Sequence, residues 1–258
     1  MSADFAVGVD GCRGGWLAAI FSGRRWLRSE IFPDIAGLWK ACREAHLILI
    51  DIPIGLPGEA CTERRCDLIA RRLVGSKRAA SIFRVPSRGA VYASSYIEAL
   101  RINREATGHG FSVQTWNIVP KIRQVDRLVA RSRKARATIW ETHPEVCFRA
   151  IAGFELKHPK RTPQGQSERL AILGKVLKDA RGIIARSKAE LAARAYSLDD
   201  LLDALVMGLT AALGKTYLIS IPRVPEKDAL GLPMRMVCMR SEEMVKKVLS
   251  YEKDLLES

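Results

Sequence analysis

Acidic residues recur in this chain where the sequence predicts that a strand ends. Asp10 closes the segment FAVGVD, Asp51 closes LILID, and Glu141 closes TIWE. In an open α/β sheet the strand ends gather at one edge, which is the usual position of a functional site. If the strands ending at Asp10 and Asp51 are parallel neighbours, their carboxylates face each other. Two such carboxylates repel, and a divalent cation between them is the simplest way to keep both ionised.

A late helix, predicted for SLDDLLDALVMGLTAALG, adds further carboxylates. Asp200 and Asp203 are three residues apart and therefore share one helix face. Asp203 lies beyond the first turn among apolar residues, where an acid needs a partner. A metal ion shared with Asp10 and Asp51 would supply that partner.

Each acid also has a structural interpretation. Asp10 beside glycine can shape a turn, and Asp51 before proline can cap the next segment. Asp199 is most simply explained as an acid at a helix N-terminus. Glu141 can pair with an arginine of the basic segment that precedes it. The joint pattern favours a functional role for Asp10, Asp51 and Asp203.

The elements that must position these acids can be read along the chain. Three meandering strands, a helix from Pro33 and a fourth strand precede a basic, mainly helical insertion at about 53–136, with helical pieces at 63–74, 95–106 and 117–131. A fifth strand ends at Glu141, a helix follows up to Gly153, and SERLAILGKVLKDARGII continues with helical periodicity after a predicted N-cap at Ser167. Two strands and a terminal helix form an extension at about 216–258. We interpret residues 1–258 as one α/β domain.

Composition narrows the class of protein. The 258 residues include 42 Lys and Arg against 28 Asp and Glu, a net charge of +14, which favours polyanionic partners. No apolar run approaches the ~20 residues of a membrane span, and the N-terminal residues lack a basic cluster, so we expect a cytoplasmic protein without a membrane partner. The six scattered cysteines are then expected to be reduced thiols. The sequence leaves the oligomeric state open, a dimer included.

Positive charge concentrates in two stretches of the insertion. The first runs from Arg64 to Arg88, and the second comprises Arg131, Arg133, Lys134 and Arg136, before the apolar ATIW. The structural alternative for each is a solvated helix face or loop. The motifs of serine hydrolases, zinc proteases and P-loop nucleotide-binding proteins are absent.

Six motifs together resemble domain-of-unknown-function family 429. They are GVDGCRGGW, IDIPIGLP, RRCDLIARRLVGSKRAASIF, WNIVPKIRQVD, ETHPEVCFRAIAG and SLDDLLDALV, in this order. Members of this family are described as predicted nucleases of the RNase H-like fold. The resemblance implies a mixed sheet of five strands, the first three antiparallel, flanked by helices.

The resemblance also implies a mechanism and a set of site residues. RNase H-like nucleases carry acids on the first strand, on the fourth strand and on a late helix, and the matching positions here are Asp10, Asp51, Asp200 and Asp203. Glu141 belongs to this family's own ETHPE motif. The implied reaction is hydrolysis of DNA or RNA with two Mg²⁺ or Mn²⁺ ions held by Asp10, Asp51 and Asp203. The phosphate contacts expected from it are Arg13, Arg64, Arg65, Arg78 and Lys121.

Two other functions stay open at this stage. The Asp-Gly turn after the first strand also occurs in actin-like ATPases and sugar kinases, but the chain shows no second turn of this kind. A basic module that binds nucleic acid without catalysis is the other alternative. Nucleic-acid binding that persists without divalent metal and without turnover would identify it.

Overall fold

A mixed sheet of five strands forms the centre of the molecule, with the order β3-β2-β1-β4-β5. The computed structural model describes residues 5–59 and 61–257. β1, β2 and β3 are antiparallel neighbours, whereas β4 and β5 run parallel to β1. The strands of this sheet are β1 Phe5–Cys12, β2 Gly15–Ser22, β3 Arg25–Phe32, β4 Leu47–Ile50 and β5 Ile139–Glu141.

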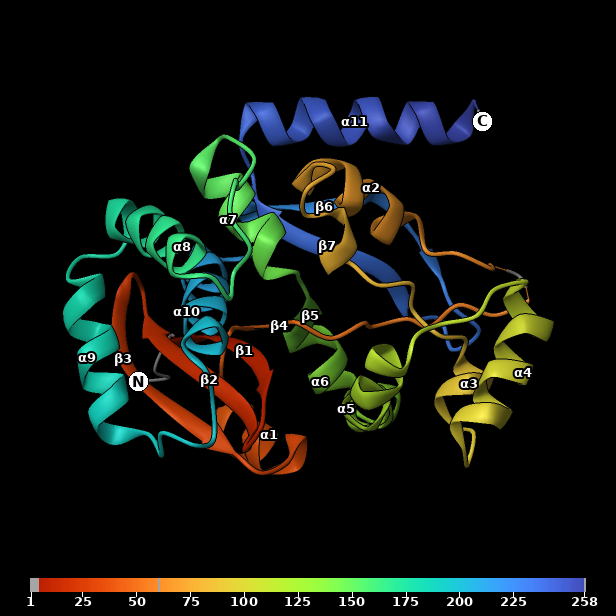
Figure 1. Ribbon diagram of the computed structural model, residues 1–258, viewed down its shortest axis with the longest axis horizontal. Coiled ribbons are helices and arrows are strands. Elements are labelled where there is room, and N and C mark those ends of the chain that lie inside the picture. The colour runs from red at the N-terminus through yellow and green to blue at the C-terminus, as the bar shows by residue number, and fades with distance from the viewer. Residues whose placement is uncertain (1–4, 60, 258) are drawn as a thin grey trace.

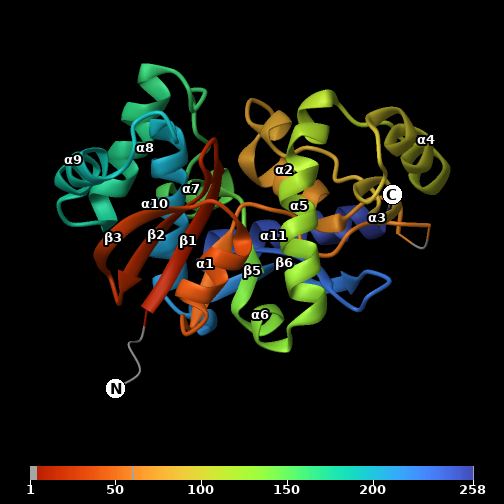
Figure 2. The same ribbon diagram turned by 90° about the horizontal axis from the view of Figure 1, so that it is seen from below.

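Helices cover both faces of this sheet (Figures 1 and 2). One face packs against α10, and the residues of that core include Leu17, Phe21, Leu49 and Leu205. The other face packs against α1 and α5 through residues such as Ile50. Strands buried on both sides need apolar residues in succession, which explains the uninterrupted runs of β2 and β4.

The helices fall into three groups along the chain. They are α1 Ile35–Cys42 before β4; α2 Arg65–Val74, α3 Arg88–Val91, α4 Tyr96–Thr107, α5 Val113–Arg131 and α6 Arg133–Thr138 between β4 and β5; and α7 Pro144–Ala152, α8 Pro163–Val176, α9 Ala180–Glu190, α10 Leu198–Ala212 and α11 Glu242–Leu256 after β5. Short 3₁₀ turns lie at η1 Ala79–Ser81 and η2 Lys215–Tyr217.

A second, two-stranded sheet follows α10. Its antiparallel strands are β6 Leu218–Lys227 and β7 Pro233–Met239. Helix α2 packs against both strands, and α11 lies along α2 and β6 (Figure 1). Helix α2, from the segment between β4 and β5, and the C-terminal strands therefore pack together beside the five-stranded sheet.

Two glycines allow α10 to approach the sheet closely. A Cβ atom on Gly8 of β1 would overlap the backbone of Gly208 in α10, and a Cβ on Gly208 would lie 2.6 Å from Cε2 of Phe21. Backbone thus packs directly on backbone at this crossing. This contact fixes the N-terminal half of α10, with its acids, beside the end of β1.

All seven strands predicted from the sequence are present, and so is the helix that Gly153 ends with a positive φ of 78°. The prediction for SERLAILGKVLKDARGII is wrong. Its N-cap is Thr162 and not Ser167, and the chain breaks at Leu177 before α9 starts again after Asp179. Pro163 at the first helical position tolerates its missing N–H, which the helical periodicity alone did not reveal. None of the helices in the described part of the chain is both long and apolar enough to cross a membrane.

Candidate active site

Asp10 and Asp51 lie at the same edge of the five-stranded sheet. In the parallel pair of β1 and β4, Val9 is opposite Ile50, and the N–H of Asp51 donates to the carbonyl oxygen of Val9 at 3.1 Å. Asp10 follows Val9 and Asp51 follows Ile50, so both acids lie at the same end of this strand pair. The expectation that the two strands are parallel neighbours is confirmed.

Helix α10 brings three further acids to this edge. Ser197 and Asp200 form a capping box, in which an oxygen of Asp200 accepts the N–H of Ser197 at 2.8 Å. Asp203 lies nearly one turn further along and is only 1% exposed. The short polar N-cap and the acids of the first turn explain why the helix starts here.

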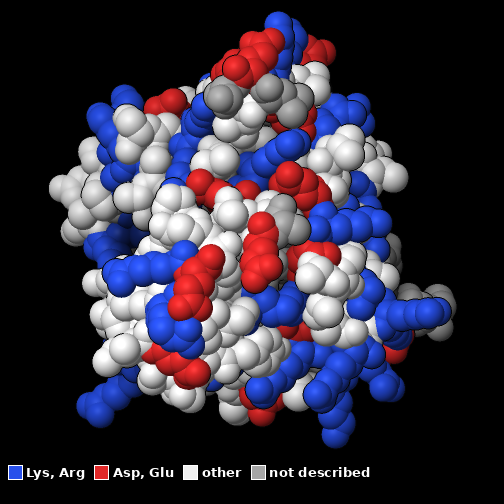
Figure 3. Space-filling model, turned by 90° about the vertical axis from the view of Figure 1, so that its right-hand side faces the viewer, with Lys and Arg blue, Asp and Glu red and all other residues white. Residues whose placement is uncertain are grey.

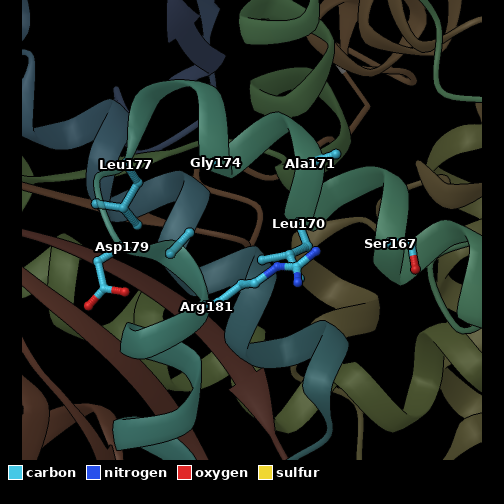
Figure 4. A pocket seen from close by; sticks show the side chains of 8 residues that line it. Ser167, Leu170, Ala171, Gly174, Leu177, Asp179 and Arg181 are labelled. Carbon is cyan, nitrogen blue, oxygen red and sulfur yellow. The ribbon is translucent and has the colours of Figure 1, made fainter.

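These acids share one cleft of about 730 Å³. Its charged lining residues are Asp10, Asp51, Asp199, Asp200, Asp203, Glu145, Lys121, Lys160 and Arg161. A second hollow of about 460 Å³ lies between α8 and α9 and is lined by residues such as Leu170, Asp179 and Arg181 (Figure 4). None of the predicted site residues lines this second hollow, so the cleft at the sheet edge is the candidate site.

Lys160 is the counter-ion of the buried acids. Its Nζ lies 2.6 Å from Oδ2 of Asp203, and its side chain is 35% exposed. Burial opposes the charge of Lys160, but the Asp203 and Asp10 carboxylates outweigh this effect and raise the pKa of the ammonium group. Lys160 therefore stays charged and supplies a positive charge to the acids in the absence of a metal ion.

Burial and mutual repulsion still disfavour the charged forms of the acids. Burial raises the pKa of Asp203 to about 6 although Lys160 lowers it, and the charge of Asp51 raises it further. Burial also raises the pKa of Asp10 well above its usual range, with contributions from Asp203 and Asp51 in the same direction. One ammonium group does not balance this set of carboxylates.

Two buried carboxylate oxygens in this region have no hydrogen-bond partner. They are Oδ1 of Asp203 and Oε2 of Glu145. Within residues 5–59 and 61–257, however, no three His, Cys, Asp or Glu side chains stand close enough together to hold a metal ion. The structure thus shows a carboxylate cleft in which Lys160 pairs with Asp203, with free oxygens that a further cation or donor can satisfy.

The stability of the protein is expected to depend on the charge of Asp203. Because folding raises the pKa of this acid, the native state binds its proton more tightly than the unfolded chain does. The free energy of unfolding should therefore fall by about 2–3 kcal/mol as the pH rises from about 4 to about 6. The Asp203→Asn variant should lose this part of the decline and keep the part that belongs to other buried acids such as Asp10. Urea denaturation of both proteins at several pH values measures the difference, and parallel pH profiles would contradict the assignment.

Lys121 is the only predicted phosphate contact among the residues that line the cleft. Its Nζ donates to the carbonyl oxygen of Gly15 and lies 4.6 Å from the ring centroid of Trp16. Burial lowers the pKa of this ammonium group. Helix α5 thus presents a partly buried cation opposite the acids.

Glu141 and Arg64 are placed elsewhere, and both site predictions need correction. Arg64 is fully buried, and its Nη2 lies 2.5 Å from Oε2 of Glu141, which also accepts the N–H of Ile54 at 2.7 Å. A guanidinium group that is 0% exposed cannot reach a phosphate. The alternative interpretation of Glu141, a pair with an arginine of the insertion, is the one that the structure supports.

Three further predicted phosphate contacts, Arg13, Arg65 and Arg78, do not line the cleft. Arg65 pairs with Glu226 at 3.2 Å, and an Nη of Arg13 donates to the carbonyl oxygen of Arg194 at 3.3 Å. The positions of Arg65 and Arg78 depend on how the insertion folds back, and that of Arg13 on a contact with Arg194 far along the chain, neither of which the local sequence encodes.

Glu145 and Lys160 are cleft residues that the sequence did not single out. Glu145 lies in the first turn of α7, is 4% exposed and pairs with the buried Arg169. Its place in the ETHPE motif was the available signal, since this motif holds two acids and only Glu141 was considered. Lys160 lies in a proline-containing loop far from the other site residues in sequence, and no local pattern marks it.

Comparison with known proteins gives one match. The family model described as "Protein of unknown function (DUF429)" matches residues 8–227, a range that contains every acid of the cleft. No curated protein and no solved structure matches the chain.

Proposed function

The chain belongs to the DUF429 family, and we propose that it is a divalent-metal-dependent nuclease that hydrolyses phosphodiester bonds of DNA or RNA. The observation that carries the proposal is the convergence of Asp10, Asp51 and Asp203 in one cleft, with an oxygen of Asp203 buried and unpartnered. The net charge of +14 supports a polyanionic substrate.

The sheet supports the same proposal. The order β3-β2-β1-β4-β5, with three antiparallel strands and two parallel ones, is the arrangement expected for an RNase H-like domain. We therefore include that fold assignment in the proposal, and we separately propose a cytoplasmic location. In such a domain the acids lie on the first strand, at the fourth strand and on a late helix, as Asp10, Asp51 and Asp203 do here.

The donor set fits Mg²⁺ or Mn²⁺, because both prefer carboxylate oxygens. Asp10, Asp51 and Asp203 would hold the ions, for which their side chains must come closer together than they stand in this structure, and Glu145 offers a further free oxygen at the edge of the set. When bound, a pair of ions supplies an activated water and stabilises the leaving oxygen. Metal binding requires Lys160 to release Asp203, because Lys160 now contacts one of the two carboxylate oxygens of Asp203.

Other side chains of the cleft would bind the substrate phosphate and transfer a proton. Lys121 and Arg161 lie where they can bind substrate phosphate. Nδ1 of His143 accepts the N–H of Glu145 at 3.2 Å, which orients the ring at the start of α7. We propose that this histidine, which also lines the cleft, transfers a proton to the leaving group.

Calorimetric titration of Mn²⁺ into the metal-free protein tests the proposal. We expect heat of binding from the wild type and none from the Asp10→Asn, Asp203→Asn double variant, because two of the three ligands lose their charge. The same proteins are then offered single-stranded, duplex and branched DNA and RNA with Mg²⁺, with Mn²⁺ and with EDTA. A wild type that neither binds Mn²⁺ in the presence of an oligonucleotide nor cleaves any of these would refute the proposal.

One observation favours a second candidate, the non-catalytic nucleic-acid-binding module. Lys160 neutralises part of the carboxylate charge without any metal, which reduces the repulsion of a phosphate backbone. Salt-dependent binding in EDTA together with no cleavage under any metal condition would identify this function.

A further inference from the structure

The second basic stretch of the insertion meets two cations from distant parts of the chain. Arg136, at the end of α6, lines a small hollow together with Trp140 of β5 and Arg235 of β7. Lys215, which follows α10, donates from Nζ to the carbonyl oxygen of Ala137 at 2.8 Å. We refer to Arg136, Trp140, Lys215 and Arg235 as the Trp140 cluster.

Two of these cations lie against the indole ring. The guanidinium carbon of Arg235 is 4.1 Å from the ring centroid of Trp140, and Nζ of Lys215 is 5.0 Å from it. Burial lowers the pKa of both groups, and the charge of Arg235 lowers that of Lys215 further. The cluster therefore holds like charges close together in a partly desolvated place.

No acid balances this charge within the described residues. None of the ion pairs formed there includes Arg136, Lys215 or Arg235. Arg136 donates to the carbonyl oxygens of Val129 and Ala130, which hold the side chain but leave its charge uncompensated. Glu141 lines the same hollow, but one of its oxygens is already occupied by Arg64 and by the N–H of Ile54.

Several other surface cations are paired with acids. Arg101 pairs with Glu105, Arg186 with Asp179 and Lys253 with Glu257. On the face that carries α3, α4 and the C-terminal end of α11, acidic side chains lie among the basic ones (Figure 3). The Trp140 cluster differs from these pairs, since two of its cations share one aromatic ring and carbonyl oxygens take the place of carboxylates.

We propose that the Trp140 cluster is a second nucleic-acid contact, which binds the phosphodiester backbone of the substrate outside the cleft. This inference rests on the proposed function for the identity of the polyanion. Phosphate oxygens would supply the negative charge that no ion pair among the described residues provides to Arg136, Lys215 and Arg235. Charge-assisted hydrogen bonds to phosphate are the interactions that guanidinium groups make best.

The geometry also defines the kind of contact. The cations already cover the indole, so the ring serves to hold them and not to stack a base. Backbone contacts of this kind carry no sequence information, but they make binding depend on salt. Helix α10, whose 15 residues span about 22 Å, separates Lys215 from the acids of the cleft, so the cluster contacts a flanking part of a long substrate.

Fluorescence anisotropy of a labelled duplex DNA in EDTA tests the proposal with the full chain. The triple variant Arg136→Gln, Lys215→Gln, Arg235→Gln removes the cations of the cluster. The matched control Arg101→Gln, Arg186→Gln, Lys253→Gln removes the same charge from paired surface positions. Between about 50 and 200 mM salt, loss of three phosphate contacts should reduce the slope of log K against log salt by about 2–3 and weaken binding at least about tenfold. The control should change the slope by much less.

Each other outcome has a defined meaning. Equal losses in both triple variants would overturn the proposal, because net charge alone would then explain the effect. Unchanged binding by the cluster variant would also overturn it, and the nuclease proposal would stand if the wild type still cleaves with Mn²⁺. If the slope falls as expected but no metal condition yields cleavage, the contact stands and the nuclease proposal fails. Binding to anionic lipid vesicles that depends on the cluster, without DNA binding, would show that this surface contacts a membrane and would refute the proposal.

The Arg235→Lys variant is a control for the possibility that the triple variant misfolds. It keeps the charge but gives up the planar stacking on Trp140, so the salt slope should stay close to that of the wild type. A loss as large as in the triple variant would show that packing around Trp140, and not phosphate binding, accounts for the result.

Discussion

Replacing Arg64 with methionine is expected to lower the free energy of unfolding by about 3–5 kcal/mol, the cost of removing one partner from a buried ion pair. Arg64 is 0% exposed and is the cation for two buried acids, Glu141 at 2.5 Å and Asp67 at 3.8 Å. Burial raises the pKa of Glu141 to about 8, against the opposite effect of Arg64. One cation with two acids is neutral when one acid keeps a proton, and removing the cation leaves the remaining charge without a partner.

Urea denaturation of the variant measures this loss. The adjacent Arg65→Met variant is the matched control, because Arg65 is 42% exposed and its pair with Glu226 is worth less than about 1 kcal/mol. Adding Asp67→Asn and Glu141→Gln to Arg64→Met should restore much of the stability, since the buried acids are then neutral. A stable Arg64→Met protein with weakened DNA binding would instead revive Arg64 as a phosphate contact.

Replacing Asp10 with asparagine is expected to reduce metal-dependent cleavage by on the order of a thousandfold, equivalent to about 4 kcal/mol of the activation barrier. The charges of Asp203, Asp51 and Asp200 all raise the pKa of Asp10, so this acid interacts with each of them. Asparagine keeps the oxygen that accepts the N–H of Gly11 at 2.8 Å, so the end of β1 should keep its shape.

The stability of this variant should equal or exceed that of the wild type. The substitution removes a buried carboxylate that repels its neighbours, and it leaves the pair of Lys160 and Asp203 intact. Asp179→Asn is a suitable control for the loss of an acid. Asp179 caps α9 outside the cleft, and asparagine tolerates its positive φ of 61°. Wild-type cleavage by a clean preparation of Asp10→Asn would remove Asp10 from the mechanism.

The strands and the two acids at their ends followed from the sequence because the information is local. Apolar runs such as LILI mark buried strands, and Asp51 directly follows one of them. The position of Asp203 within α10 was predictable for a similar reason, since an acid among apolar residues breaks the helical pattern in a recognisable way. The resemblance to the family added the grouping of Asp10, Asp51 and Asp203.

Only the tertiary structure decided which charges reach the cleft. Arg64 and Lys121 belong to the same basic insertion, yet one is buried in an ion pair with Glu141 and the other faces the acids. The sequence shows the charge of a side chain but not the carboxylate it will meet, because ion pairs such as Lys160 with Asp203 join residues 43 positions apart. Burial then sets the protonation of Asp203, and the packing of α10 on β1 sets its distance from Asp10. Local sequence patterns thus determined the helices and strands and the acids that they carry. Long-range contacts in the fold determined which charged side chains these acids meet.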